Sequence, residues 1–309
     1  MNRPMMEPRR WDQARGFLEH HARRLDWALL RFRFEEGEAN DVLEALAAFA
    51  NPDGGFGHAL EPDVRTPSSS ALATALALRI LDELDSSEAD GLIRSAVRFF
   101  VASLEANTLV WRPVPEDVNN YPHAPWWHDE DGSLANTFDS FRIIPRALIV
   151  ALLHRHRDAV PSDWLDRLTE ATLLAVDAVG VLGEGGGSDL EYVSALAQTA
   201  GIPDQVRLAA RVRRDVVRAV ARDPAKWTTY CITPLRAVPT PNAPGADLIR
   251  DLVDHHVRVV LDTQNEEGCW NPTWSWFGAY PETWEVAMRE WQGVLTLETL
   301  TSLRAYGYA

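Results

Sequence analysis

A short glycine-rich stretch, residues 51–65, carries several side chains that can move protons. Asp53, His58, Glu61 and Asp63 all fall within it. A second carboxylate close by raises the pKa of one member of the pair, and a carboxyl group with a raised pKa donates protons at neutral pH. We therefore expect Glu61 or Asp63 to act as a general acid, with Asp53 and His58 as further catalytic residues.

The two carboxylates, Glu61 and Asp63, precede a predicted helix. Pro67 is followed by an Ala- and Leu-rich helical pattern over residues 68–84, and proline suits the first helical turn because its missing N–H costs nothing there. A carboxylate at a helix N-terminus is stabilised as the anion. The structural alternative is that Asp63 caps this helix while Glu61 pairs with Arg65.

A second stretch, residues 119–131, combines planar side chains with titratable ones. It contains Tyr121, His123, Trp126, Trp127 and His128. Tryptophan and tyrosine rings stack on sugars, and their π-faces stabilise carbocations. We expect His123 to be catalytic and the three aromatic residues to bind substrate. The alternative is a tryptophan-rich loop that only fills the interior.

A third stretch, residues 270–291, is rich in tryptophan with glutamates between. An aromatic-lined ligand cavity with a few acids has this composition, and so does the ordinary core of a last helical hairpin. Under the first interpretation the stretch contributes several substrate-binding residues, joined by Phe56 from the first stretch. The predicted residues are Phe56, Trp270, Trp274, Trp276 and Glu282.

The elements that must position these side chains are helical. Apolar residues recur every three or four positions, and strand-like alternation is rare. The predicted helices cover residues 11–34, 41–49, 68–84, 89–104, 141–155, 162–179, 190–199, 203–222, 246–263 and 284–306. Because no linker divides the chain, we predict an all-α fold in one domain, residues 1–309.

Three predicted helix ends share one design. Gln264–Trp270 reads Q-x-x-x-G-x-W, Ala50–Phe56 keeps the glycine and the aromatic residue, and Glu105–Trp111 keeps the aromatic residue. Glycine supplies a positive φ for a tight turn, and the aromatic ring folds back over the helix end. The glutamine reaches main-chain groups that a helix terminus leaves unpaired. The spacing favours an internal repeat.

These motifs resemble those of the terpenoid cyclase and protein prenyltransferase superfamily. Gln264–Trp270 resembles the core of the QW motif of squalene–hopene-type cyclases, and residues 53–57 resemble the D/G-G-F-G turns of that superfamily. The resemblance implies an α/α toroid, in which inner and outer helices surround a cavity. It also implies an isoprenoid-type or otherwise largely apolar substrate that a carboxylic acid protonates.

The chain departs from these families in its catalytic motifs. It has no D-x-D-D, no D-D-x-x-D and no prenyltransferase zinc motif around Cys231. We therefore expect no metal and no cofactor. A carbohydrate-active α/α toroid, whether hydrolase, lyase or epimerase, and a toroid that binds a peptide or small molecule without catalysis stay open as alternatives.

The composition argues against several classes of partner. The chain of 309 residues has 30 basic and 45 acidic side chains, a net charge of −15, which disfavours nucleic-acid phosphates and anionic membranes. No apolar run is long enough to span a bilayer, and the N-terminal residues lack a signal-peptide core. Two cysteines give no disulfide framework. We expect a cytoplasmic protein with a small-molecule substrate and no nucleic-acid partner.

Overall fold

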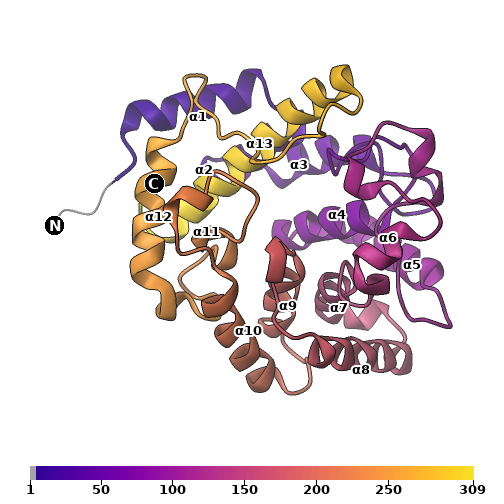
Figure 1. Cartoon of the computed structure of the whole chain (residues 1–309). Helices are drawn as coiled ribbons and strands as arrows, with labels where there is room; N and C mark the ends of the chain where they lie inside the picture. Colours follow the sequence, from indigo (N-terminus) through magenta and orange to yellow (C-terminus); the bar gives the residue numbers. More distant parts are fainter. Residues whose placement is uncertain (1–4) are drawn as a thin grey trace. The chain divides into compact units, whose positions relative to one another are not determined.

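The computed structural model describes residues 5–309, and this part of the chain is helical (Figure 1). It contains the helices α1 to α13 and short 3-10 turns, and its extended backbone pairs only in isolated bridges. The predicted all-α fold is therefore confirmed. Among the same residues, no helix combines the length and the apolar character that a membrane crossing requires.

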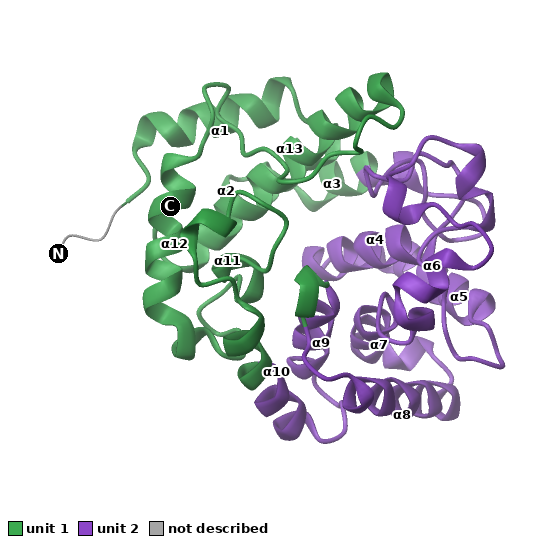
Figure 2. Cartoon of the chain, viewed as in Figure 1, with its two compact units in different colours: residues 1–45, 183–187, 213–309 green, residues 46–182, 188–212 purple. Residues whose placement is uncertain are grey.

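Tertiary contacts group the chain into two compact units (Figure 2). Unit 1 consists of residues 5–45, Gly183–Gly187 and Arg213–Ala309, and unit 2 of Leu46–Leu182 and Ser188–Val212.

Unit 1 holds α1 (Pro8–His20), α2 (Arg24–Phe34), α3 (Ala39–Leu46) except its last residue, α11 (Pro234–Ala237), α12 (Arg250–Asp262) and α13 (Pro281–Ala305). Unit 2 holds α4 (Ala71–Leu84), α5 (Asp90–Ser103), α6 (Ser133–Thr137), α7 (Arg146–Arg155), α8 (Ser162–Ala178) and α9 (Asp189–Ala197), and α10 (Gln205–Ala219) runs from unit 2 into unit 1. The single domain and the closed ring of helices stay predictions.

The core of unit 2 is built around α7. Its residues from Arg146 to His154 are all buried, as expected of a helix that is apolar on nearly every side. It packs against α4, α8 and α9, while α4 also packs against α5. These contacts make a firm support for the loop that leads into α4, where two of the predicted acids lie.

The start of α4 corrects one prediction. Pro67 does not occupy the first helical turn, because the helix begins at Ala71 and Ser70 is its N-cap. The main-chain N–H of Ser70 donates to the carbonyl of Phe56 at 2.9 Å, which holds the intervening residues in a loop. Neither Asp63 nor its neighbouring glutamate therefore lies at the helix N-terminus, and the capping role is taken by a serine.

In unit 1 the long helix α13 packs on both α1 and α2. The prediction of one helix over residues 11–34 is wrong, because α1 ends at His20 and the backbone of Arg23 is extended. The guanidinium of Arg23 binds both carboxylate oxygens of the buried Asp26 at 2.9 Å. This pairing fixes the start of α2 and lets the two short helices pack separately on α13.

Three turns repeat the design predicted from the sequence. They are the first turn (Ala50–Phe56), the second turn (Glu105–Trp111) and the third turn (Gln264–Trp270). The fifth residue of each has a positive φ: +90° at Gly54, +55° at Leu109 and +92° at Gly268. The predicted use of glycine is thus confirmed in the first and third turns, while the second turn forces a leucine into the left-handed region.

The aromatic residue that ends each turn is buried. The indole N–H of Trp111 donates to the carbonyl of Phe100 at 3.0 Å, and that of Trp270 donates to the carbonyl of Val260 at 2.9 Å. In both cases the acceptor belongs to the helix that precedes the turn. Phe56 has no such donor and packs at 1% exposure instead. The predicted closure of the turn over the helix end is confirmed for the two tryptophans.

Candidate functional site

Two loops of unit 2 lie backbone to backbone and form the candidate site. We name them the acidic loop (residues 57–70) and the histidine loop (residues 121–128). Val64 of the first pairs with His123 of the second in an antiparallel bridge, and main-chain hydrogen bonds of 2.9 and 3.1 Å lie on either side of this pair. Two of the three stretches predicted to carry chemistry are therefore neighbours.

The acidic loop buries both of its carboxylates. Glu61 is 7% exposed and Asp63 is 2% exposed. A cavity of about 10 Å³ lies beside Glu61 and is otherwise lined by apolar and hydroxyl side chains of the same loop and by Ala73 of α4. This volume is at the lower limit for one water molecule. Burial and polar surroundings are what a proton donor of controlled strength requires.

Asp53 and His58 take different positions from these acids. Both are exposed. Asp53 accepts hydrogen bonds from the N–H of Gly55 at 2.9 Å and from the hydroxyl of Ser69 at 2.8 Å, so it braces the first turn. The Nε2 atom of His58 lies 2.9 Å from the side-chain oxygen of Asn51. Both residues thus support the entry to the acidic loop.

Asp117 also binds the acidic loop through its carboxylate. The sequence did not indicate this residue. It accepts a hydrogen bond of 2.7 Å from the hydroxyl of Ser68 and one of 3.2 Å from that of Thr66. These partners lie 49 and 51 residues away in the chain, so no local spacing marks Asp117. The hydroxyl and carboxylate groups make this flank of the site polar.

The histidine loop contains a hydrogen-bonded imidazole pair. His123 is 3% exposed; its Nδ1 atom lies 2.6 Å from the carbonyl oxygen of Tyr121, and its Nε2 atom lies 3.0 Å from Nδ1 of His128. Burial lowers the pKa of His123, the Tyr121 carbonyl opposes that shift, and the charge of His128 adds to it. His128 itself is exposed. The pair therefore connects a buried imidazole with the surface.

The predicted substrate-binding aromatic residues of unit 2 fall into two groups. Phe56 and Trp127 are 1% and 7% exposed, and the Trp127 ring stacks on Phe138 with 5.0 Å between the ring centroids. Tyr121 and Trp126 are only half-buried. The first group contributes packing to the interior, whereas the second keeps part of its ring surface accessible on the histidine loop.

The third predicted stretch belongs to unit 1. Trp270 and Trp276 are 7% and 0% exposed. Trp274 is half-buried and meets Trp291 edge to face, with 5.0 Å between centroids and 83° between planes. Trp276 contacts Tyr280 and Trp284, so the rings of this stretch make separate aromatic contacts within unit 1. The predicted convergence of this stretch with the acidic and histidine loops stays a prediction.

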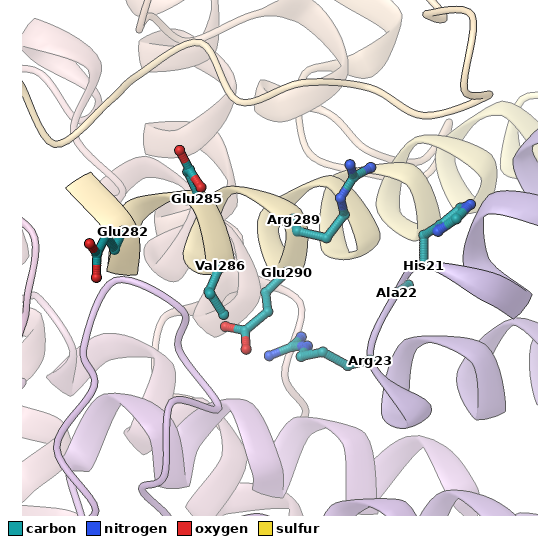
Figure 3. Close-up of a pocket in the computed structure, with 8 residues that line it drawn as sticks. All are labelled: His21, Ala22, Arg23, Glu282, Glu285, Val286, Arg289 and Glu290. Carbon is teal, nitrogen blue, oxygen red and sulfur yellow. The ribbon is translucent and has the colours of Figure 1, made fainter. Parts of the chain in front are cut away.

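Unit 1 also has a pocket of about 410 Å³ between the α1–α2 connection and the first half of α13 (Figure 3). Glu282 lines it, and the side chains of Glu290 and Arg23 point toward one another (Figure 3). Its other lining residues are His21, Ala22, Glu285, Val286 and Arg289. Six of the eight lining residues carry ionisable side chains, so the pocket can hold polar groups.

Comparison with models of known protein families found no match for the chain, and comparison with curated proteins found none either. The cyclase resemblance accordingly rests on the motif residues alone. Among the described residues 5–309, no three His, Cys, Asp or Glu side chains are grouped so as to hold a metal ion. The chemistry available at the paired loops is that of carboxyl groups, imidazoles and hydroxyls.

Proposed function

We propose that this protein is an enzyme that performs acid–base chemistry on a small molecule at the paired loops of unit 2. Glu61 or Asp63 supplies the acid, and the imidazole pair of the histidine loop supplies the base. The observation that carries the proposal is the burial of two carboxylates and one imidazole on loops that are hydrogen-bonded to each other. Groups held in this way on a helical scaffold keep their geometry during a reaction.

The first substrate class is isoprenoid, as the cyclase resemblance implies. A carboxyl group would transfer its proton to an alkene carbon, forming a C–H bond and leaving a carbocation on the neighbouring carbon. The base would then remove a proton from the next carbon, and the electrons of that C–H bond would form a new alkene. The half-buried rings of Tyr121 and Trp126 can stabilise the cation through their π-faces.

The second substrate class is carbohydrate, and the polar flank of the acidic loop favours it. Thr66, Ser68 and Asp117 form a hydroxyl–carboxylate network there. Half-buried tyrosine and tryptophan rings beside an acid and a base are typical of sites that bind sugars. Under either class we place the activity in the cytoplasm.

A substrate panel tests the proposal. Purified chain is incubated separately with polyprenyl diphosphates, squalene, and a set of mono- and oligosaccharides, and products are identified by mass spectrometry. Wild type is compared with Glu61→Gln, Asp63→Asn and the matched control Glu130→Gln, which changes an exposed carboxylate close to the histidine loop. We expect turnover of one class, lowered at least 100-fold by one acidic-loop variant and unchanged in the control. Equal turnover by all four proteins would remove both buried carboxylates from the mechanism.

A further inference from the structure

The hydrogen bonds of the histidine loop determine which nitrogen carries the proton on each ring. The Nδ1 atom of His123 is 2.6 Å from the carbonyl oxygen of Tyr121. A carbonyl oxygen only accepts, so this Nδ1 bears the hydrogen, and in the neutral ring Nε2 holds the lone pair. That Nε2 is 3.0 Å from Nδ1 of His128. His128 must therefore donate from Nδ1, which leaves the lone pair of its own ring on Nε2.

The arrangement of the rings agrees with this assignment. The planes of His123 and His128 are 7° apart, with 5.2 Å between centroids, so the donated hydrogen lies close to the plane of the accepting ring. His123 is buried and both of its nitrogens are engaged, whereas His128 is exposed. We propose that the base of the site is Nε2 of His128 and that His123 is the residue that positions it. This inference rests on the proposed function and names its base.

The proton balance of this step is simple. The substrate transfers a proton to Nε2 of His128, and the electron pair of the broken bond stays on the substrate. His128 becomes an imidazolium whose Nδ1–H still donates to His123. Because burial lowers the pKa of His123, that ring stays neutral and keeps its accepting lone pair. Water can later remove the proton from the exposed Nε2, which restores the base.

Charged groups adjoin the pair in the chain and on the acidic loop. Asp129, next to His128, accepts from Arg112 at 2.8 Å and, through its carbonyl, from the side chain of Asn119 at 2.6 Å. On the acidic loop, Asp63 and Arg65 flank the residue that pairs with His123. His123 also interacts with the main chain of Tyr121 and Val118. The tautomer of His128 is thus set by the neighbouring imidazole.

Nitrogen NMR of the full chain tests this inference without any substrate. Free neutral histidine favours the Nε2–H form, so we expect an unusual Nδ1–H form for both His123 and His128 in the ¹⁵N-labelled protein at pH 8. His58, whose Nε2 donates to Asn51 at 2.9 Å, is the internal control for the Nε2–H form. In His123→Phe, His128 should revert to Nε2–H. An Nε2–H form of His128 in the wild type overturns the inference, whatever the variant does.

Enzyme kinetics provide a second test of the inference. With a substrate found in the panel, His128→Gln should lower kcat at least 100-fold and leave KM nearly unchanged, whereas His20→Gln on α1 should match the wild type. Full activity of His128→Gln would overturn the base assignment and leave the proposed function standing. Failure of wild-type chain to convert any substrate would overturn the proposed function, while the tautomer measurement would still report on the pair.

Discussion

The first and third turns are nearly identical in their bonding, yet they lead into different surroundings. In each, the N–H of the aromatic residue donates to a threonine of a later helix: Phe56 to Thr74 at 3.0 Å and Trp270 to Thr296 at 3.2 Å. The first turn continues into the acidic loop with its buried carboxylates, and the third continues into the tryptophan-rich stretch of unit 1. The turn itself is therefore scaffold, and the residues after it are the ones to which we assign the proposed chemistry in unit 2.

The second turn shows how the same scaffold is built from other residues. In the third turn, the side-chain amide of Gln264 donates to the carbonyl of Gly268 at 2.9 Å. Glu105 stands at the glutamine position of the second turn, and its side chain has no N–H to donate. There the carbonyl of Leu109 accepts from Arg146 at 3.0 Å. Arg146 is 2% exposed, and burial lowers its pKa to about 10. A buried guanidinium thus replaces the missing amide.

The largest stability effect is expected at the two turn glycines. A Cβ at Gly268 would lie 2.4 Å from the main chain of Gln13, and one at Gly54 would lie 2.6 Å from the carbonyl of Ser95, in addition to the strain of positive φ. We expect Gly268→Ala and Gly54→Ala each to lower the free energy of unfolding by about 2–4 kcal/mol, measured by urea denaturation.

Helical glycines serve as controls for these substitutions. Gly16 on α1 and Gly91 on α5 have open space where a Cβ would stand. Alanine at either position should raise stability by roughly 0.5–1 kcal/mol, because alanine favours the helix. If the turn variants behaved like these controls, the two turns would not be the tightly docked elements described above.

Acid should weaken unit 1 through His256. Burial lowers the pKa of this imidazole to about 4, well below the 6.5 of an exposed histidine. At pH values between 4 and 6.5, the unfolded chain therefore binds a proton at this histidine and the folded chain does not. The free energy of unfolding falls as the pH decreases from 6.5 toward 4. The loss attributable to this group is roughly 3 kcal/mol.

Unfolding curves collected from pH 7 to pH 4 measure this loss. His256→Asn keeps an acceptor for the N–H of Leu235, which lies 3.4 Å from the ring, but it has no titrating group. Its stability should be lower at pH 7 and change less with pH than that of the wild type. Equal slopes for the two proteins would exclude His256 as a source of acid sensitivity.

The smallest effect is expected at the second turn. Leu109 holds a φ of +55°, which costs a leucine about 1–2 kcal/mol, whereas glycine tolerates this conformation but loses more entropy on folding. Leu109→Gly should therefore be about 0.5 kcal/mol more stable than the wild type in thermal unfolding. Asn107→Gly, in the same turn but without positive φ, should be less stable; a loss of stability at both positions would contradict the strain at Leu109.

Local patterns predicted the helices and the turn glycines because both depend on near neighbours in the chain. They misplaced the start of α4 because Ser68, Ser69 and Ser70 are all suitable caps, and a hydrogen bond to Phe56 decides between them. Glu61 and Asp63 were indicated by their closeness to each other in a glycine-rich connection before a predicted helix. Asp117, by contrast, acts through partners distant in sequence, and no spacing rule detects such a residue.

A double-mutant cycle on kcat/KM tests most directly whether the acidic and histidine loops form one site. Asp63→Asn, His128→Gln and the combined variant are compared with the wild type on the substrate that the panel identifies. Groups that act in one reaction are strongly non-additive, so the double variant should be about as slow as the slower single variant. Losses that simply multiply would show that the two loops act independently and would contradict a shared site.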